Sequence, residues 1–217
     1  MSYTTLDPAK TGVLFFDMLN AGFGTHDEAY ERLKASIVER CVRVREAADA
    51  HGIPVFFARA DHRPDGKDAV ILYSDLNRAH EPWKDPENDR FKPYRANLAG
   101  QWGSQVIDEL GAGPDDYMIP KHRKNAFFQT RLELSVRSRG IDTIVLCGSA
   151  IPSGIAATVY GAQDLDLNVV VVRDACQPKA GPVHDAFMDR VFPRIGRVRT
   201  AEEVVEMMRA GAAEPSR

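Results

Sequence analysis

The chain has 217 residues, of which 44% are hydrophobic and 27% are charged, a size and composition suited to one globular domain with a substantial core. Its formal net charge is -3 and it has no Lys/Arg-rich tract, so nucleic acid is not an expected partner. No apolar run reaches the length of a membrane span, and the first residues lack signal-peptide features, so we expect a cytoplasmic protein without a membrane partner.

Runs of β-branched and aromatic residues alternate with helical patterns along the chain. The predicted strands are 12–17, 53–59, 116–120, 142–147, 168–174 and 196–199, and the predicted helices are 27–51, 104–110, 132–138, 153–163, 183–191 and 201–210. The helix 27–51 has a capping-box pattern at Thr25–Glu28 and a stop at Gly52. The long crossovers predict the α/β class: a three-layer α/β/α sandwich with a mainly parallel, six-stranded, Rossmann-like sheet, in a single domain of residues 1–217.

The stretch 62–103 breaks this alternation with scattered prolines and charged residues. We interpret it as an extended segment over one edge of the sheet, because long loops in compact domains are commonly lids or binding elements. A plain surface excursion or an oligomer contact is the alternative. Residues 211–217 are expected to form a flexible tail.

Polar residues gather where the predicted strands end, which is where open parallel sheets bind ligands. They are Asp17, Arg59, Lys121, the turn at Gly148, and Asp174. Asp17 by itself could be only a helix cap, and Lys121 only a solvated lysine. However, Lys121 follows an apolar strand and precedes the aromatic pair Phe127–Phe128, so we expect it to be partly buried near a carboxylate.

Three cysteines are present, at positions 41, 147 and 176. An odd number without a CxxC pair argues against a disulfide framework and a structural zinc site. Cys41 falls on the apolar face of a predicted helix and Cys147 inside a strand, so both are expected to be small core residues. Cys176 follows a strand end and could approach the rim of a site, although a structural role is favoured.

Three motifs carry a family resemblance: Phe16-Asp-Met-Leu-Asn-Ala-Gly-Phe23, Lys121-His-Arg-Lys-Asn-Ala-Phe-Phe128, and Val145-Leu-Cys-Gly148 through Thr158. With their flanks, from about Lys10 to Met208, they resemble the isochorismatase-like hydrolases of the cysteine hydrolase superfamily. Most members hydrolyse amides with an Asp-Lys-Cys triad and have a non-proline cis peptide before the cysteine. The resemblance implies catalytic roles for Asp17 and Lys121, places Gly154 at the cysteine position, and puts the cis bond at Ala150–Ile151.

The glycine at the thiol position is shared with the isochorismatases proper, which hydrolyse a vinyl ether and release pyruvate. The resemblance therefore implies that Asp17 is a general acid and that no nucleophile is required. Aromatic residues near Asp17, including Phe15, Phe16 and Phe23, would raise its pKa by desolvation, whereas Lys121 would lower it. We expect the space beside Gly154 to be open to the substrate. Two alternatives stay open: an amide or C–N hydrolase in which Asp17 and Lys121 activate water, and a catalytically inactive binding protein.

Two departures leave the substrate open, because isochorismatases have Gln where this chain has Leu19 and a different turn where it reads Ala150-Ile-Pro-Ser153. Ser153 could be a nucleophile, but a serine at a helix start is more often the N-cap. Nicotinamidase-type relatives bind zinc through Asp-x-His, a spacing that Asp61–His62 lacks, so we expect no metal and no cofactor.

We expect the protein to act on a small anionic substrate. We also expect it to form a homo-oligomer, either a dimer or a tetramer. Arg59 and Arg123 are candidates for carboxylate recognition, because a guanidinium offers a bidentate fork. The full set of substrate-binding candidates is Phe23, Arg59, Arg123, Phe127, Ala150, Ile151 and Ser153.

Overall fold

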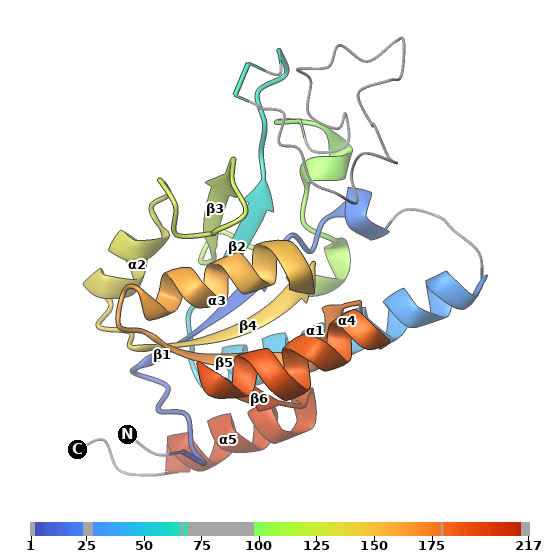
Figure 1. The fold of residues 1–217 in the computed structure, drawn as a ribbon. Coiled ribbons are helices and arrows are strands. Elements are labelled where there is room, and N and C mark those ends of the chain that lie inside the picture. Colours follow the sequence, from blue (N-terminus) through green and yellow to red (C-terminus); the bar gives the residue numbers. More distant parts are fainter. Residues whose placement is uncertain (1–2, 24–27, 66, 69–97, 179, 214–217) are drawn as a thin grey trace.

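The computed structural model describes residues 3–23, 28–65, 67–68, 98–178 and 180–213, which are built around one six-stranded sheet (Figure 1). The strands are β1 (Thr11–Phe16), β2 (Val55–Ala60), β3 (Tyr117–Lys121), β4 (Thr143–Ser149), β5 (Asn168–Gln177) and β6 (Arg197–Arg199). Their order is β3-β2-β1-β4-β5-β6, and every pairing is parallel. The predicted fold class and the six predicted strands are confirmed.

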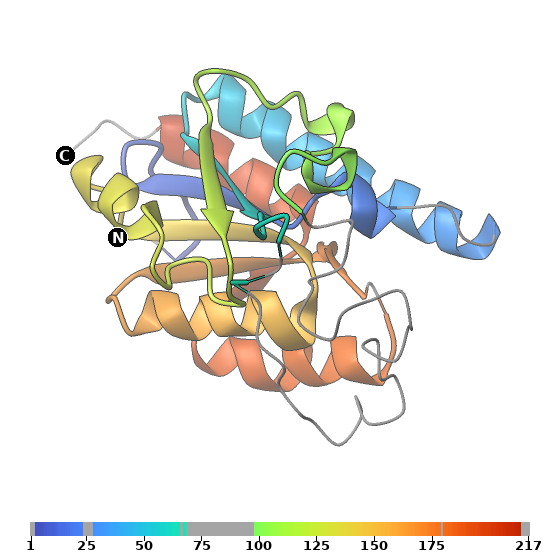
Figure 2. The same cartoon turned by 90° about the horizontal axis from the view of Figure 1, so that it is seen from above.

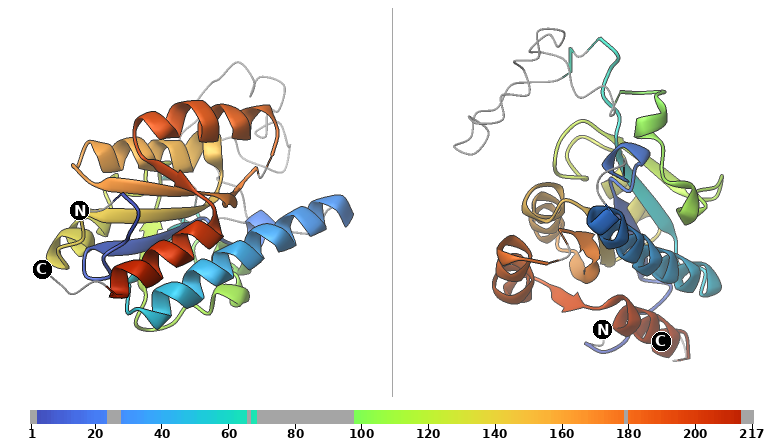
Figure 3. Two further views of the ribbon diagram at one scale, coloured as in Figure 1. Left: turned by 90° about the horizontal axis from the view of Figure 1, so that it is seen from below. Right: turned by 90° about the vertical axis from the view of Figure 1, so that its right-hand side faces the viewer.

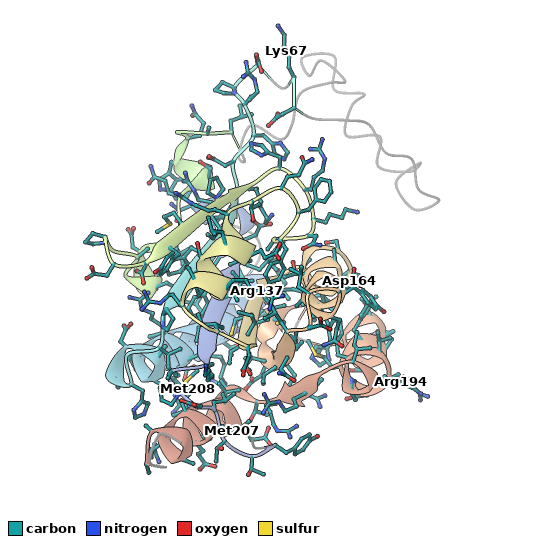
Figure 4. The ribbon with its side chains drawn as sticks, turned by 90° about the vertical axis from the view of Figure 1, so that its left-hand side faces the viewer. Lys67, Arg137, Asp164, Arg194, Met207 and Met208 are labelled. Carbon is teal, nitrogen blue, oxygen red and sulfur yellow. The ribbon has the colours of Figure 1, made fainter. Side chains whose placement is uncertain are left out.

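Helices cover both faces of this sheet (Figure 2). They are α1 (Glu28–Ala50), α2 (Leu132–Ser138), α3 (Ala156–Gln163), α4 (Pro182–Asp185) and α5 (Ala201–Ala213). Helices α1 and α5 lie side by side on one face (Figure 3), where Met207 and Met208 of α5 join the core (Figure 4). Helices α2 and α3 cover the other face. Because side chains alternate along a strand, neighbouring Phe15 and Phe16 enter opposite cores.

The longest predicted helix is confirmed, because α1 follows the predicted pattern almost end to end. Its Ile37, Cys41 and Val44 are fully buried in the core that α1 shares with α5. Gly52 follows the helix with a φ of +65°, a left-handed conformation that glycine adopts without steric cost and that stops helices. The capping box at Thr25–Glu28 lies largely outside the described residues.

The helix predicted at 104–110 is wrong, because the chain forms two separate 3₁₀ turns there, Trp102–Ser104 and Asp108–Leu110. Between them Val106 bridges Leu19, and the amide of Ile107 donates to the carbonyl of Met18 over 3.1 Å. These long-range backbone hydrogen bonds replace the local ones that a helix would have made. The segment is thereby attached to the chain just beyond β1.

Three further helices differ from prediction at their ends. The helix expected at 153–163 begins with a π-helical turn at Ile151–Ile155, and that expected at 183–191 is α4 followed by a π-helical turn at Ala186–Val191. Helix α5 runs to Ala213, three residues into the expected tail, because Gly211 packs tightly on Leu6: a Cβ there would lie 1.9 Å from the Leu6 carbonyl oxygen.

The segment 62–103 is described only at its two ends. His62 forms a parallel bridge with Leu98, and the amide of Ala99 donates to the His62 carbonyl over 2.8 Å. The interpretation of its middle as a lid or oligomer contact lies outside the described residues. Across the parts of the chain that are described, no helix is long and apolar enough to cross a membrane.

Candidate active site

The strand-end charges predicted from the sequence meet directly. Lys121, the last residue of β3, donates from Nζ to Oδ2 of Asp17 over 2.7 Å. The other carboxylate oxygen, Oδ1, accepts the amide of Ala60 over 2.8 Å, and the Asp17 amide donates to the Ala58 carbonyl over 2.8 Å. Asp17 has a φ of 48°, a left-handed conformation that is uncommon outside glycine. Its carboxylate is therefore oriented by β2 and β3 and does not cap a helix.

The pKa of Asp17 is raised above that of an ordinary aspartate. Desolvation by burial is the largest cause and outweighs the lowering effects of the Lys121 ammonium, the Ala60 amide and His62. Lys121 is only 4% exposed, while the Asp17 side chain keeps 26% of its surface exposed. Of the opposing influences expected from the sequence, desolvation is the larger, so the protonated acid is more favoured in Asp17 than in an ordinary aspartate.

The position of the missing thiol is occupied by an aromatic ring. A Cβ added to Gly154 would lie 2.2 Å from Cε1 and 2.4 Å from Cζ of Phe16. The expectation that this space is open to the substrate is wrong, because Phe16 points to the α3 face of the sheet, as strand alternation dictates. Phe15, grouped with Phe16 in the sequence argument, instead stacks on Phe57 in the opposite core, with 5.4 Å between ring centroids.

The turn after β4 differs from the expectation at two positions. The cis peptide lies at Ser149–Ala150, one residue earlier than expected, because β4 ends at Ser149, which still pairs with Gln177. Ala150 is the extended residue before the helical turn, and its carbonyl accepts the amides of Ser153 and Ile155 over 3.3 and 3.1 Å. Ser153 therefore lies inside the turn and is not the N-cap. Ile151 is fully buried, and its contact with a substrate stays a prediction.

The loop that follows Lys121 is fastened to α3. Thr158 accepts the amide of Ala126 at its hydroxyl oxygen over 3.0 Å. The side chain of Asn125 lies against Gly161, where an added Cβ would meet its Nδ2 at 2.2 Å. The candidate Phe127 is buried in the same core as Phe16, so it supports the site from below the loop. The Lys121 ammonium is thus carried by a strand end and a loop that are both anchored.

The two candidate arginines lie in different places. Arg123 is exposed, on the loop that follows Lys121, and donates from Nη1 to the carbonyls of Asp68 and His122 over 3.0 and 2.7 Å. Arg59 donates to the Ser104 carbonyl over 3.4 Å and shares the sheet face of Phe57, opposite that of Lys121. Phe23 ends the 3₁₀ turn Asn20–Phe23, and its side chain lies outside the described residues. Contact of these three residues with a substrate stays a prediction.

A histidine pair beside the site was missed by sequence reasoning. Oδ2 of Asp68 lies 3.5 Å from His62 Nδ1 and 3.4 Å from His122 Nε2. Burial lowers the pKa of His62, against the raising effect of Asp68. Asp68 falls in an irregular segment, so no periodic pattern marked it. Among the residues that are placed, no group of three or more His, Cys, Asp or Glu is arranged to hold a metal ion.

The three cysteines are all buried, as expected for core residues. Cys176, the one that could have approached the rim, donates from Sγ to the Leu146 carbonyl over 3.8 Å inside the sheet. Burial raises its pKa well above that of a free thiol, and it does the same for Cys147. Neither thiol has the exposure or the ionisation of a nucleophile.

Known proteins share this fold and this sequence pattern. A family model described as the isochorismatase domain matches residues 11–203. An uncharacterised isochorismatase family protein, YecD of Escherichia coli O157:H7, is 33% identical over 79% of this chain and 83% of its own length. The ureidoacrylate amidohydrolase RutB of Pseudomonas syringae pv. syringae is 29% identical over 82% of this chain and 74% of its own. The structure of an isochorismatase family protein from Burkholderia thailandensis superposes with a TM-score of 0.76, at 26% identity, over 96% of this chain and all of that one.

Proposed function

Since the chain belongs to the isochorismatase family of hydrolases, we propose that it hydrolyses the vinyl-ether bond of a small anionic molecule of the isochorismate type. Asp17 is the general acid, and no covalent enzyme intermediate forms. The observation that carries this proposal is the pairing of a carboxyl group of raised pKa with a filled nucleophile position. A general acid needs the first, and thiol catalysis is incompatible with the second.

In the proposed reaction, the electron pair of the enol-ether double bond takes the proton of Asp17 at the methylene carbon. The resulting oxocarbenium ion is captured by water, and the hemiketal breaks down to pyruvate and an alcohol. Asp17 is left as a carboxylate, which Lys121 stabilises across 2.7 Å and the Ala60 amide across 2.8 Å. That carboxylate then accepts the proton released by the attacking water, which restores the acid.

An anionic substrate suits the charge around the mouth of the site. Arg123 lies two residues beyond Lys121 and is exposed, and in the described contacts only Nη1 of its guanidinium donates to backbone carbonyls. Its remaining N–H donors can face a carboxylate. We assign it the recognition of the substrate carboxylate, while Arg59 would serve a more distant anionic group because it lies on the other face of the sheet.

An amide or other C–N bond is the second candidate. The Asp17–Lys121 pair supports it, since an ionised Asp17 could activate water, and RutB, a relative along most of the chain, is named an amidohydrolase. This route needs the carboxylate form, which the raised pKa of Asp17 disfavours. A binding protein without activity is the third candidate.

Product analysis separates the three candidates. The purified protein is incubated with a panel of enol-pyruvyl ethers and, separately, ureido and amide compounds, and pyruvate and ammonia are quantified. Pyruvate release that is lost in Asp17→Asn supports the proposal. Ammonia release alone would replace it with amide hydrolysis, and tight binding of a panel compound without either product would make the protein a binding protein.

A further inference from the structure

One aromatic ring contacts both halves of the candidate site. The Phe16 ring lies with its centroid 4.2 Å from Nζ of Lys121, the same nitrogen that binds Asp17. One edge of the ring fills the volume that a side chain at position 154 would need, with Cε1, Cζ and Cδ1 at 2.2, 2.4 and 3.1 Å from an added Cβ. Distances under 3.0 Å essentially never occur for a real Cβ, so Phe16 and any residue larger than glycine at 154 exclude each other.

The ring cannot easily move aside, because its backbone is held on two sides. Phe16 pairs in parallel with Ala58 of β2 and with Gly148 of β4. At Gly148 the strands approach so closely that a Cβ would lie 2.1 Å from the Phe16 carbonyl oxygen, and its φ of +125° also requires glycine. The Phe16 side chain is fully buried. The backbone register therefore fixes the face to which the Phe16 side chain points, and burial leaves the ring little room to move.

Contact with the ring also acts on Lys121. An ammonium over an aromatic face is attracted by the ring quadrupole, and this attraction is stronger when the charge is desolvated, as it is for this buried lysine. The ring and the Asp17 carboxylate together hold the ammonium. Without the ring, the long lysine side chain would have more freedom and water would have a route to Asp17.

We infer that Phe16 is a positioning residue that sets the type of reaction: its ring closes the nucleophile position and holds Lys121 against Asp17. The inference rests on the proposed function only in taking Asp17 and Lys121 as the reacting pair. It assigns Gly154 a steric role as the partner of Phe16. Truncation of Phe16 should then open a volume beside Lys121 in which a thiol at position 154 can stand.

The first test is a thermal-unfolding cycle with Gly154→Ala, Phe16→Ala and the double variant. In a helical backbone without crowding, Gly to Ala is neutral or stabilising. Here we expect Gly154→Ala to lower Tm by about 5 °C when Phe16 is present, and to have little or no further effect after Phe16→Ala. Phe15→Ala is the matched control, because Phe15 is equally buried on the same strand but faces the other core. Its effect should add to that of Gly154→Ala. Additive effects in the Phe16 cycle would overturn the inference.

The second test measures the reactivity of a cysteine introduced at position 154 after Phe16 has been truncated. In Phe16→Ala/Gly154→Cys, iodoacetamide should alkylate the new thiol at least tenfold faster than it labels Gly154→Cys, and the thiol should titrate below the free value because Lys121 is near. The added change Lys121→Met should slow labelling at neutral pH. The three native cysteines are buried and give a low background. If Phe16→Ala/Gly154→Cys does not fold, Phe16→Leu/Gly154→Cys takes its place, and its thiol should also be alkylated faster than that of Gly154→Cys.

The outcomes of the two tests are independent of turnover. The positioning role would be contradicted if the thiol at position 154 were labelled equally fast with and without Phe16, or if Lys121→Met left the labelling rate unchanged. This holds even if Asp17 proves essential. Conversely, a coupled Phe16–Gly154 pair together with a fully active Asp17→Asn would leave the inference about the ring standing and remove the proposed function.

Discussion

Two aspartates lie near the carboxyl ends of strands in this sheet and have different partners. Asp17 faces the buried ammonium of Lys121 and one backbone amide, and its pKa is raised by burial. Asp174 on β5 accepts the Ala201 amide over 2.8 Å at the start of α5 and pairs with Arg40 of α1 over 3.2 Å. Both fit the sequence pattern of a strand-end acid. Only their partners show that the first is suited to proton transfer and the second to holding helices.

The two carboxyl groups also differ in the parts of the fold that their partners connect. Asp174 satisfies both oxygens with groups that link α1 and α5 to the sheet. Asp17 follows β1 at the carboxyl ends of the strands, and its oxygens are held by the Ala60 amide of β2 and by Lys121 of β3, whose ammonium lies over the Phe16 ring. Each of the following predictions tests this contrast.

The largest effect is expected from Asp17→Asn, which removes the acidic proton and leaves the side-chain shape. We expect kcat to fall by about 100-fold or more, as for the loss of a general acid, with the fold retained by circular dichroism. The matched control, Asp174→Asn, should keep activity within about twofold but lose about 1 kcal/mol of stability through its capping contact. Similar losses of activity in both variants would contradict the distinction.

Replacing the cation beside each aspartate, Lys121 for Asp17 and Arg40 for Asp174, should also affect activity only at Asp17. Lys121→Met should lower kcat by roughly 10- to 100-fold, because the carboxylate formed by proton transfer loses its partner. Lys121→Arg should restore little, since a planar guanidinium does not fit a site built for a compact ammonium. Arg40→Met, at the equivalent place beside Asp174, should leave kcat unchanged. Steady-state kinetics on the same substrate checks all three variants, and normal turnover in Lys121→Met would place the lysine outside the mechanism.

The pH dependence should report the raised pKa of Asp17. Activity requires the protonated acid, so kcat/KM should fall as pH rises through that pKa, which lies above the ordinary aspartate value. Lys121 lowers this pKa, so the fall should move to higher pH in a Lys121→Met variant that retains measurable activity. An activity that instead rises with pH through this range would indicate a carboxylate base and favour C–N hydrolysis.

The raised pKa of Asp17 should also make the stability of the folded protein depend on pH. Because the folded-state pKa of Asp17 is raised, the folded protein binds this proton more tightly than the unfolded chain. The contribution to stability is complete below the unfolded pKa and is lost as pH rises through the folded pKa. The difference in unfolding free energy between wild type and Asp17→Asn should therefore decline with rising pH over this window, as measured by urea unfolding at several pH values.

The smallest effect is expected from thiol reagents. Cys176 lies on the same strand as Asp174 and is buried, with a raised pKa, so iodoacetamide should neither label it in the folded protein nor reduce activity. The Cys176→Ala variant should keep its activity. Stoichiometric inactivation traced by mass spectrometry to Cys176, and prevented by substrate, would make this thiol the nucleophile.

The class of fold, the six strands and the main helix could be predicted from the sequence, because they follow from the spacing of apolar residues within each segment. The sequence also marked Asp17 and Lys121 as strand-end charges. The prediction failed where distant segments compete with local structure, as at 104–110, where Val106 bridges Leu19 and breaks the expected helix. The histidine pair at Asp68 was missed because Asp68 falls in an irregular segment and the three residues come together only in space.

The construction of the site could not be predicted in this way, because it depends on contacts between segments far apart in the chain. Asp17 and Lys121 are 104 residues apart in the chain, and their contact depends on the order of β3, β2 and β1 in the sheet. Gly154 in the sequence indicates a missing thiol, but nothing local shows that the ring of Phe16 takes its volume. Side-chain packing between strands and helices is a property of the assembled sheet. A pattern along one segment fixes which face a residue points to, whereas what it meets there is fixed by the other segments.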